Sequence, residues 1–340
     1  MKDEAKAAEH GQGAESPEFI PVLGWRDIAW RVVHEVIEDR VMLIAAGVTY
    51  YLLLALVPSL AVFVSLYGLF NDRSTVLQHI SLLTGVLPAG GIDILTDQLT
   101  RLTSTPSGTL SLTLVFSLVV ALWSASAGIN ALFDVMNIAY DEKEKRNLLV
   151  RMGTALAFTL GAIVAAAVFL TTVVVIPLIF QAFYLGKGFE WLIRLASYAL
   201  MLGLTMFGVA ALYRWGPSRR QAKWRWVSPG AIFTVVCIAI VSVLYSWYAA
   251  TFANYSVTYG SLGALVGLLT WIWLSVIILI IGAEINAEAE HQTARDSTTG
   301  RPKSLGHRGA YMADHVAEVG PGATPDGKSM RAPSKRTGQG

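Results

Sequence analysis

The sequence predicts an all-α, polytopic integral membrane protein with six transmembrane helices, both termini in the cytoplasm, and amphipathic helices at the membrane interface. Of the 340 residues, 54% are hydrophobic and 15% are charged, whereas soluble domains carry about 25% charged residues. Asp, Glu, Lys and Arg are also absent from five long stretches that together hold 175 residues. This composition excludes an ordinary soluble enzyme. It also excludes a disordered chain, because disorder requires low hydrophobicity.

The uncharged stretches define the spans, since a transmembrane helix needs about 20 apolar residues. Each of the first four stretches holds one span. The fifth, over residues 226–283, is too long for one helix and is interrupted by a polar segment at 254–261, so it holds two. The predicted spans within a transmembrane domain of residues 41–290 are residues 41–70, 109–133, 152–182, 190–213, 228–252 and 261–284.

The cations between the spans predict the orientation. In chain order, the segments outside the spans hold 5, 2, 4, 2, 5, 0 and 8 Lys and Arg residues, where Arg194 at the outer end of the fourth span is counted with the loop before it. Alternate segments therefore hold 22 against 4, and the cation-rich segments are the cytoplasmic ones. This alternation requires an even number of spans and places both termini inside. Residues 1–20 have no apolar core of a signal peptide, so we expect the first span to be retained.

The segments outside the spans differ in composition. Residues 1–19 and 291–340 are polar and without periodicity, which predicts a disordered cytoplasmic N-terminus and tail. Residues 20–40 predict an amphipathic interfacial helix, with Trp25, Ile28 and Val32 on one stripe and Asp27, Arg31 and Glu35 as a ladder on another. The external loop, residues 71–108, repeats apolar residues at helical spacing in two runs and predicts two short amphipathic helices.

Small residues recur at helical spacing inside two spans. Gly153, Ala157 and Gly161 follow one face of the third span, and Gly263 and Gly267 open the sixth. Such stripes let helix backbones approach closely in a membrane. We expect these residues to mediate helix packing within the chain, and a homo-oligomer face is the alternative.

Ionisable and polar groups at membrane depth are candidates for a transport pathway. Asn130 and Asp134 lie four residues apart on the second span, and Glu284 ends the sixth. The alternatives are that Asp134 is solvated at the interface and that Glu284 belongs to a helix running out into the cytosol. Pro58 and Pro177 lie inside spans, where proline can kink a helix beside a cavity or simply adjust static packing.

The loop before the fifth span is strongly basic. Arg219, Arg220, Lys223 and Arg225 are interleaved with tryptophans and lie near no acid in the sequence. They are candidate contacts for anionic lipid headgroups on the cytoplasmic face. A nucleic-acid patch is the alternative, but the positive-inside rule already explains the loop, so no nucleic-acid partner is expected.

Other motifs predict neither a nucleotide site nor a cofactor. Residues Gly322–Ser329 match GxxxxGK[ST], but that pattern needs a strand before it and a helix after it, and this copy lies among prolines in the tail. The six histidines are scattered, and Cys237 is the single cysteine. We therefore expect no metal site, no catalytic residues and no cofactor.

Three segments carry a family resemblance: residues 45–58, residues 212–231 and residues 259–286, the last ending in Gly-Ala-Glu-Ile-Asn286. Together they resemble the YihY/BrkB family of bacterial inner-membrane proteins, over about residues 25–290. The resemblance implies six spans, both termini inside and a location in the bacterial inner membrane. Members were formerly labelled ribonuclease BN, a label regarded as a misassignment. The metal-binding His and Asp cluster of such a nuclease is missing from this sequence, and the resemblance implies little about activity.

The sequence therefore favours a transporter or flippase that acts on a lipid or other amphipathic envelope molecule, with membrane lipids as partners. A non-transporting membrane scaffold for envelope organisation is the alternative. An enzymatic function, including the ribonuclease one, is disfavoured.

Overall fold

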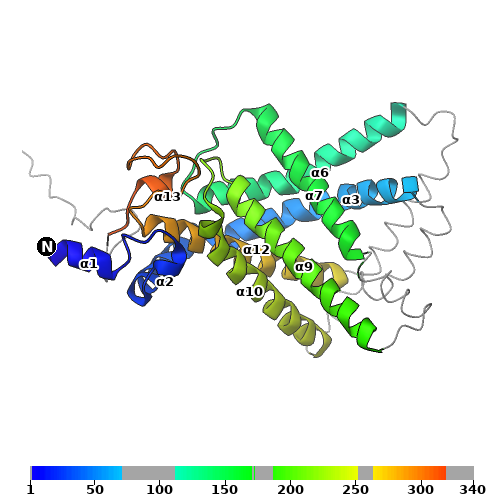
Figure 1. Cartoon of the computed structure of the whole chain (residues 1–340). Coiled ribbons are helices and arrows are strands. Elements are labelled where there is room, and N and C mark those ends of the chain that lie inside the picture. The colour runs from blue at the N-terminus through cyan, green and yellow to red at the C-terminus, as the bar shows by residue number, and fades with distance from the viewer. Residues whose placement is uncertain (1, 71–111, 171, 173–186, 252–262, 319–340) are drawn as a thin grey trace, which may run out of the picture.

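The computed structural model describes residues 2–70, 112–170, 172, 187–251 and 263–318 (Figure 1). Within these ranges every regular element is a helix, and the only extended pairing is an isolated bridge between Ala222 and Thr298. The all-α prediction is therefore confirmed for this part of the chain. The predicted external loop, Pro177 and the Gly322–Ser329 motif lie outside the described residues.

Long helices coincide with all six predicted spans. Their bounds are α3 Val41–Phe70, α6 Leu112–Ala139, α7 Leu148–Leu170, α9 Lys187–Trp215, α10 Trp224–Thr251 and α12 Gly263–His291. By length and composition over the described residues, α7, α9, α10 and α12 can each cross a membrane, and a bent pair adds a fifth candidate. This agrees with a membrane protein, whereas the count of six spans stays a prediction.

The tightest helix contact joins α10 to α12, which run alongside each other (Figure 1). A Cβ atom on Gly230 would lie 1.9 Å from the carbonyl oxygen of Gly282. Gly230 also donates its backbone N–H to Asn286 Oδ1 at 2.8 Å. Farther along the pair, Tyr245 donates its hydroxyl to the carbonyl oxygen of Gly267 at 2.9 Å, so Gly267 does lie at a helix contact, as expected.

One end of the helix bundle is covered by four segments, which we call the cap: residues 2–40, 140–147, 216–223 and 292–318. Figure 1 shows α1 (Lys2–Glu9), α2 (Val22–Glu38) and α13 (Tyr311–Asp314) together at this end. The loops join them, because Ser218 donates its N–H to Asn137 Oδ1 at 2.7 Å and Lys223 donates to the carbonyl of Ser297 at 2.9 Å. These are the segments that the cation count assigned to one side of the membrane.

The expectation of disorder in residues 1–19 and 291–340 is not met where the structure describes them. Gln292 donates to the carbonyl of His10 at 2.8 Å, and Thr293 donates to that of Ala14 at 2.7 Å, so the two termini bind each other. The guanidinium of Arg308 is buried and donates to four backbone carbonyls. Polar side chains that satisfy buried backbone groups hold this region together, and composition alone did not reveal them.

Helix α2 buries Ile28 and Val32 of the predicted apolar stripe, together with polar residues of the neighbouring face. Asp27 and Arg31 are buried, whereas Trp30 and Ile37 are 56% and 71% exposed. The predicted ladder does not form, because Asp27 pairs with His10, and Arg31 pairs with Glu288 of α12. The predicted stripe therefore packs on the protein, and the further apolar residues Trp30 and Ile37 face outward, which suits a helix lying in a membrane interface.

The Arg31–Glu288 pair predicts a large effect of breaking it. Arg31→Met leaves the Glu288 carboxylate, whose side chain is 0% exposed, buried without its cation. We expect a loss of about 3–5 kcal/mol in the free energy of unfolding, measured by chemical unfolding of the full chain in detergent micelles.

The control is Arg151→Met, which removes the partner of the 57% exposed Asp134 side chain and should cost about 0–1 kcal/mol. The double variant Arg31→Met, Glu288→Met should recover most of the lost stability. A single Arg31→Met variant as stable as the control would contradict the role of this pair.

Candidate functional site

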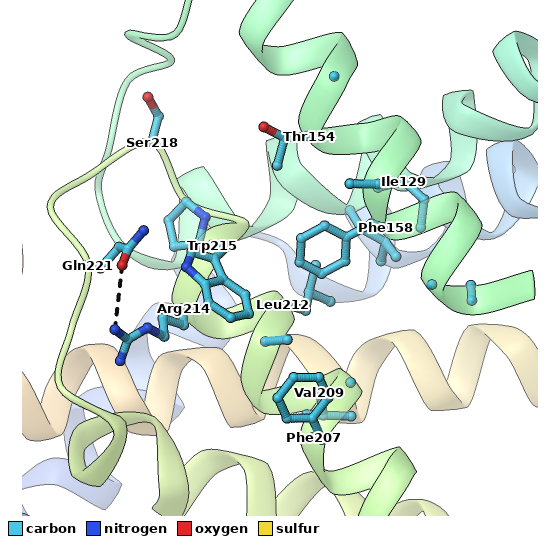
Figure 2. Close-up of a pocket in the computed structure, with 18 of the residues that line it drawn as sticks. Ile129, Thr154, Phe158, Phe207, Val209, Leu212, Arg214, Trp215, Ser218 and Gln221 are labelled. Carbon is cyan, nitrogen blue, oxygen red and sulfur yellow. Dashed lines mark hydrogen bonds between the residues drawn. The ribbon is translucent and has the colours of Figure 1, made fainter. Parts of the chain in front are cut away.

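A groove lies between α7 and α9, with a volume of about 1380 Å³. That exceeds the roughly 300–1,000 Å³ typical of small-molecule sites. Its walls are mainly apolar, and Figure 2 shows Phe158 of α7 and Phe207 of α9 on its two sides, with Arg214 and Gln221 at one end. The groove therefore pairs a long apolar surface with a charged end, the arrangement that an amphipathic molecule requires.

The small residues of α7 line this groove instead of a helix interface. Gly153, Ala157 and Gly161 all belong to the lining. A Cβ atom added to Gly153 or Gly161 would meet nothing within 4 Å among the described residues. The expectation that this stripe packs against another helix of the chain is therefore wrong for the described part. Small side chains here widen the groove, since a larger residue would project into it.

The charged end of the groove comes from the cap. Lys145, Arg146, Arg214, Arg219 and Arg220 all line it. Three of these cations are neutralised locally. Lys145 pairs with Glu142 at 2.7 Å. Arg146 binds both carboxylate oxygens of Glu144 at 2.7 and 2.8 Å, and Arg219 binds both oxygens of Glu290 at 2.6 and 3.0 Å. These ion pairs hold the cap loops in place. The positive charge at the groove that no carboxylate neutralises among the described residues is therefore that of Arg214 and Arg220.

Arg214 and Arg220 have no carboxylate partner among the described residues. Arg214 donates to the carbonyl of Ala222 at 2.9 Å, and its guanidinium lies 4.5 Å from the ring centroid of Trp224. Its Nε and the Nη1 of Arg220 are both buried without an acceptor. An unmet buried donor on a cation costs free energy, so this end of the groove is suited to receive an anion.

The predicted headgroup contacts divide in the structure. Arg220 lines the groove, and so does Arg219, but the latter is committed to Glu290. Lys223 donates to the carbonyl of Asp296 at 2.7 Å, and Arg225 is exposed outside the groove lining. Arg214 was missed as a site residue, although its place at the last turn of a span beside two tryptophans was a signal for it.

Asn130 and Asp134 form a separate cluster with Arg151. Arg151 donates to Asn130 Oδ1 at 3.0 Å and to both Asp134 oxygens at 2.8 and 2.9 Å. Neither Asn130 nor Asp134 lines the groove. The structure therefore joins two of the three predicted pathway residues and leaves the third, Glu284, elsewhere.

Glu284 lies beneath α2 and is 1% exposed, with its Oε1 lacking any hydrogen-bond partner among the described residues. Four more carboxyl groups surround it: Glu35, Asp39, Asp141 and Glu288. The end of α12 from Asn286 to Glu290 is buried beneath the cap rather than exposed, so Glu284 does not lie on a solvated helix end. Across the described ranges, no three His, Cys, Asp or Glu side chains are placed to hold a metal ion.

The carboxyl cluster raises the pKa of two groups that precede the first span: Glu35 in α2 and Asp39 directly after it. Burial, together with the carboxylates of Glu288 and Asp141, raises the pKa of Glu35 to about 8. Burial together with Asp141 and Glu38 raises the pKa of Asp39 to about 6. Both groups therefore hold protons in the folded protein at a pH where the unfolded chain releases them.

This predicts a stability that falls as the pH rises from about 4.5 to 8. Glu35 in the unfolded chain titrates near 4.5, so across this window the folded state binds more protons, and rising pH favours unfolding. Glu35→Gln should melt at the same temperature as the native chain at pH 4 and at a higher one at pH 8. The exposed Glu18→Gln is the control. If the melting temperatures of the native and Glu35→Gln proteins changed by the same amount between pH 4 and pH 8, the raised pKa of Glu35 would be disproved.

Three known proteins are similar to this chain in sequence. The chain is 35% identical over 190 residues to YfkH of Bacillus subtilis, named a ribonuclease-like protein, covering 51% of this chain and 64% of that one. It is 25% identical over 282 residues to a UPF0761 membrane protein of Pseudoalteromonas translucida, covering 81% and 88%. A UPF0761 membrane protein of Bordetella petrii is 25% identical over 302 residues, covering 88% and 65%.

The matches thus span less than two thirds of the length of YfkH and of the Bordetella protein. No solved structure matches the chain. The family described as virulence factor BrkB matches residues 32–305, which include α3, α6, the groove helices and all of α12. The chain therefore belongs to the virulence factor BrkB family of membrane proteins.

Proposed function

We propose that this protein crosses the bacterial inner membrane six times, with both termini in the cytoplasm, and moves an amphipathic envelope lipid between the leaflets. Long helices at all six predicted positions and the cation count of 22 against 4 support the topology. The cap supports it too, because four alternate segments of the chain meet at one end of the bundle. An even number of crossings between them gives this arrangement.

The groove between α7 and α9 is the observation that carries the proposal. A lipid that changes leaflet must keep its chains in an apolar setting while its headgroup passes polar partners. The groove offers small and apolar side chains along α7 and α9, and cations where it meets the cap. Arg214 and Arg220 attract the headgroup there, and the stripe from Gly153 to Gly161 leaves room for the chains.

The cap supports a second candidate, a membrane scaffold that organises envelope proteins without transport. Its charged groups are locked in place by the Arg31–Glu288 and Arg219–Glu290 pairs, which make a rigid platform on the cytoplasmic side. A scaffold leaves lipid movement unchanged, so one assay separates the two functions. The ribonuclease-like name of YfkH does not alter the proposal that this chain is not an enzyme.

The test is lipid transfer in vesicles that contain the purified full chain. A fluorescent lipid placed in one leaflet should exchange faster than in protein-free vesicles. Gly161→Leu should bring the rate back to that of protein-free vesicles, because the new side chain projects into the groove. Its free energy of unfolding should stay within about 0.5 kcal/mol of the native value, since nothing described lies within 4 Å of that Cβ position.

Gly282→Ala provides the contrast in stability. Its Cβ would lie 2.0 Å from Thr234 Oγ1 and 2.4 Å from the Tyr213 hydroxyl, so we expect a loss of about 1–3 kcal/mol in the free energy of unfolding.

Native protein that transfers no lipid, while remaining folded, would reject the transport function and favour the scaffold.

A further inference from the structure

We propose that the charged end of the groove is a phosphate site for a diacyl lipid, in which Arg214 and Arg220 hold the headgroup phosphate and the acyl chains lie along α7. The inference rests on the proposed function, whose substrate class it names. It assigns the recognition to two particular residues of the basic loop rather than to the general positive charge of the cytoplasmic face.

The first argument is an excess of donors over acceptors at this end. At this end, three guanidinium nitrogens are buried without an acceptor among the described residues: Arg214 Nε, Arg219 Nε and Arg220 Nη1. All three side chains belong to the groove lining, and the Arg219 side chain is 0% exposed. Glu290 already neutralises Arg219. The remaining positive charge of Arg214 and Arg220 therefore has no acid to meet it among the described residues.

The second argument is the geometry of the anion. Guanidinium groups present planar pairs of donors that match phosphate oxygens and form charge-assisted hydrogen bonds. A phosphodiester shares its negative charge between two unesterified oxygens, and each oxygen can accept more than one hydrogen bond. The phosphate of a lipid headgroup therefore suits the end of the groove that Arg214 and Arg220 line.

The third argument is how Arg220 is held. Its backbone N–H donates to the carbonyl of Gly309 at 2.9 Å, and a Cβ on Gly300 would lie 2.5 Å from its Nη2. Gly300 has a φ of +93°, which side chains other than glycine rarely allow. The C-terminal segment thus passes close against Arg220 and supports a residue that has no ion pair to orient it.

The fourth argument concerns the lipid chains. Arg214 lies over the ring of Trp224, which stacks on Phe207 of the groove wall at a centroid distance of 6.1 Å. Tryptophan beside a cation is typical of the headgroup level of a membrane. From Phe207 the lining continues into the apolar part of the groove, so a phosphate bound by the arginines has its chains directed along an apolar surface.

The test measures binding to the purified full chain by native mass spectrometry with three probes: phosphatidylglycerol, a diacylglycerol with the same chains, and glycerol 3-phosphate. We expect phosphatidylglycerol to bind at least about tenfold more tightly than either fragment, as charged hydrogen bonds warrant. Arg214→Gln, Arg220→Gln as a double variant should bind phosphatidylglycerol no better than diacylglycerol. The exposed Arg301→Gln, outside the groove lining, is the control for surface charge.

Equal binding of phosphatidylglycerol and diacylglycerol would overturn the phosphate site. If glycerol 3-phosphate bound as tightly as phosphatidylglycerol, the claim that the site takes a lipid would be rejected. The site would then be one for a soluble phosphate. If Arg225→Gln or Arg301→Gln weakened phosphatidylglycerol binding as much as the double variant does, general surface charge would explain the binding, and the specific site would be rejected. Because binding is measured without transfer, selective binding without lipid movement would reject the proposed function alone.

Discussion

Two carboxylates on α12, Glu288 and Glu290, are buried to 0% exposure, and the architecture of the cap depends on the cations that meet them. A buried charge without a partner is too costly for a folded protein to keep. Arg31 reaches Glu288 from α2, and Arg219 reaches Glu290 from the basic loop. The two pairs therefore fix the N-terminal helix and the loop between α9 and α10 on the same stretch of one long helix.

The same pairing shapes the groove. Arg219 forms an ion pair with Glu290 and thereby anchors the loop. Arg214 and Arg220 line the groove nearby without a carboxylate partner among the described residues. Across from them, α7 presents Gly153 and Gly161 with no described atom near their Cβ positions. The loop is thus held by an ion pair, while the small residues of α7 and two arginines without a carboxylate partner among the described residues line the groove. This is the arrangement that the proposed lipid site requires.

Periodicity and charge counts predicted the helices, because a membrane span leaves a long uncharged stretch whatever its neighbours are. They failed where tertiary partners decide. Nothing local shows that Arg31 would leave the i,i+4 ladder for Glu288, 257 positions away, or that Arg308 would order the C-terminal segment. The glycines of α7 and α10 look alike in sequence, yet Gly230 lies at a helix contact and Gly161 faces a groove. Glu284 was selected as an ionisable group at membrane depth, but the sequence could not show the four carboxyl groups that surround it.

The most direct test asks what lies against position 161 in the native membrane. A photoreactive phenylalanine analogue in place of Gly161 should crosslink to a phosphate-bearing lipid, because that face of α7 opens into the groove. The adduct would be identified by its mass after digestion. A crosslink to a second copy of the chain would instead identify the stripe as an oligomer face. That result would contradict the account.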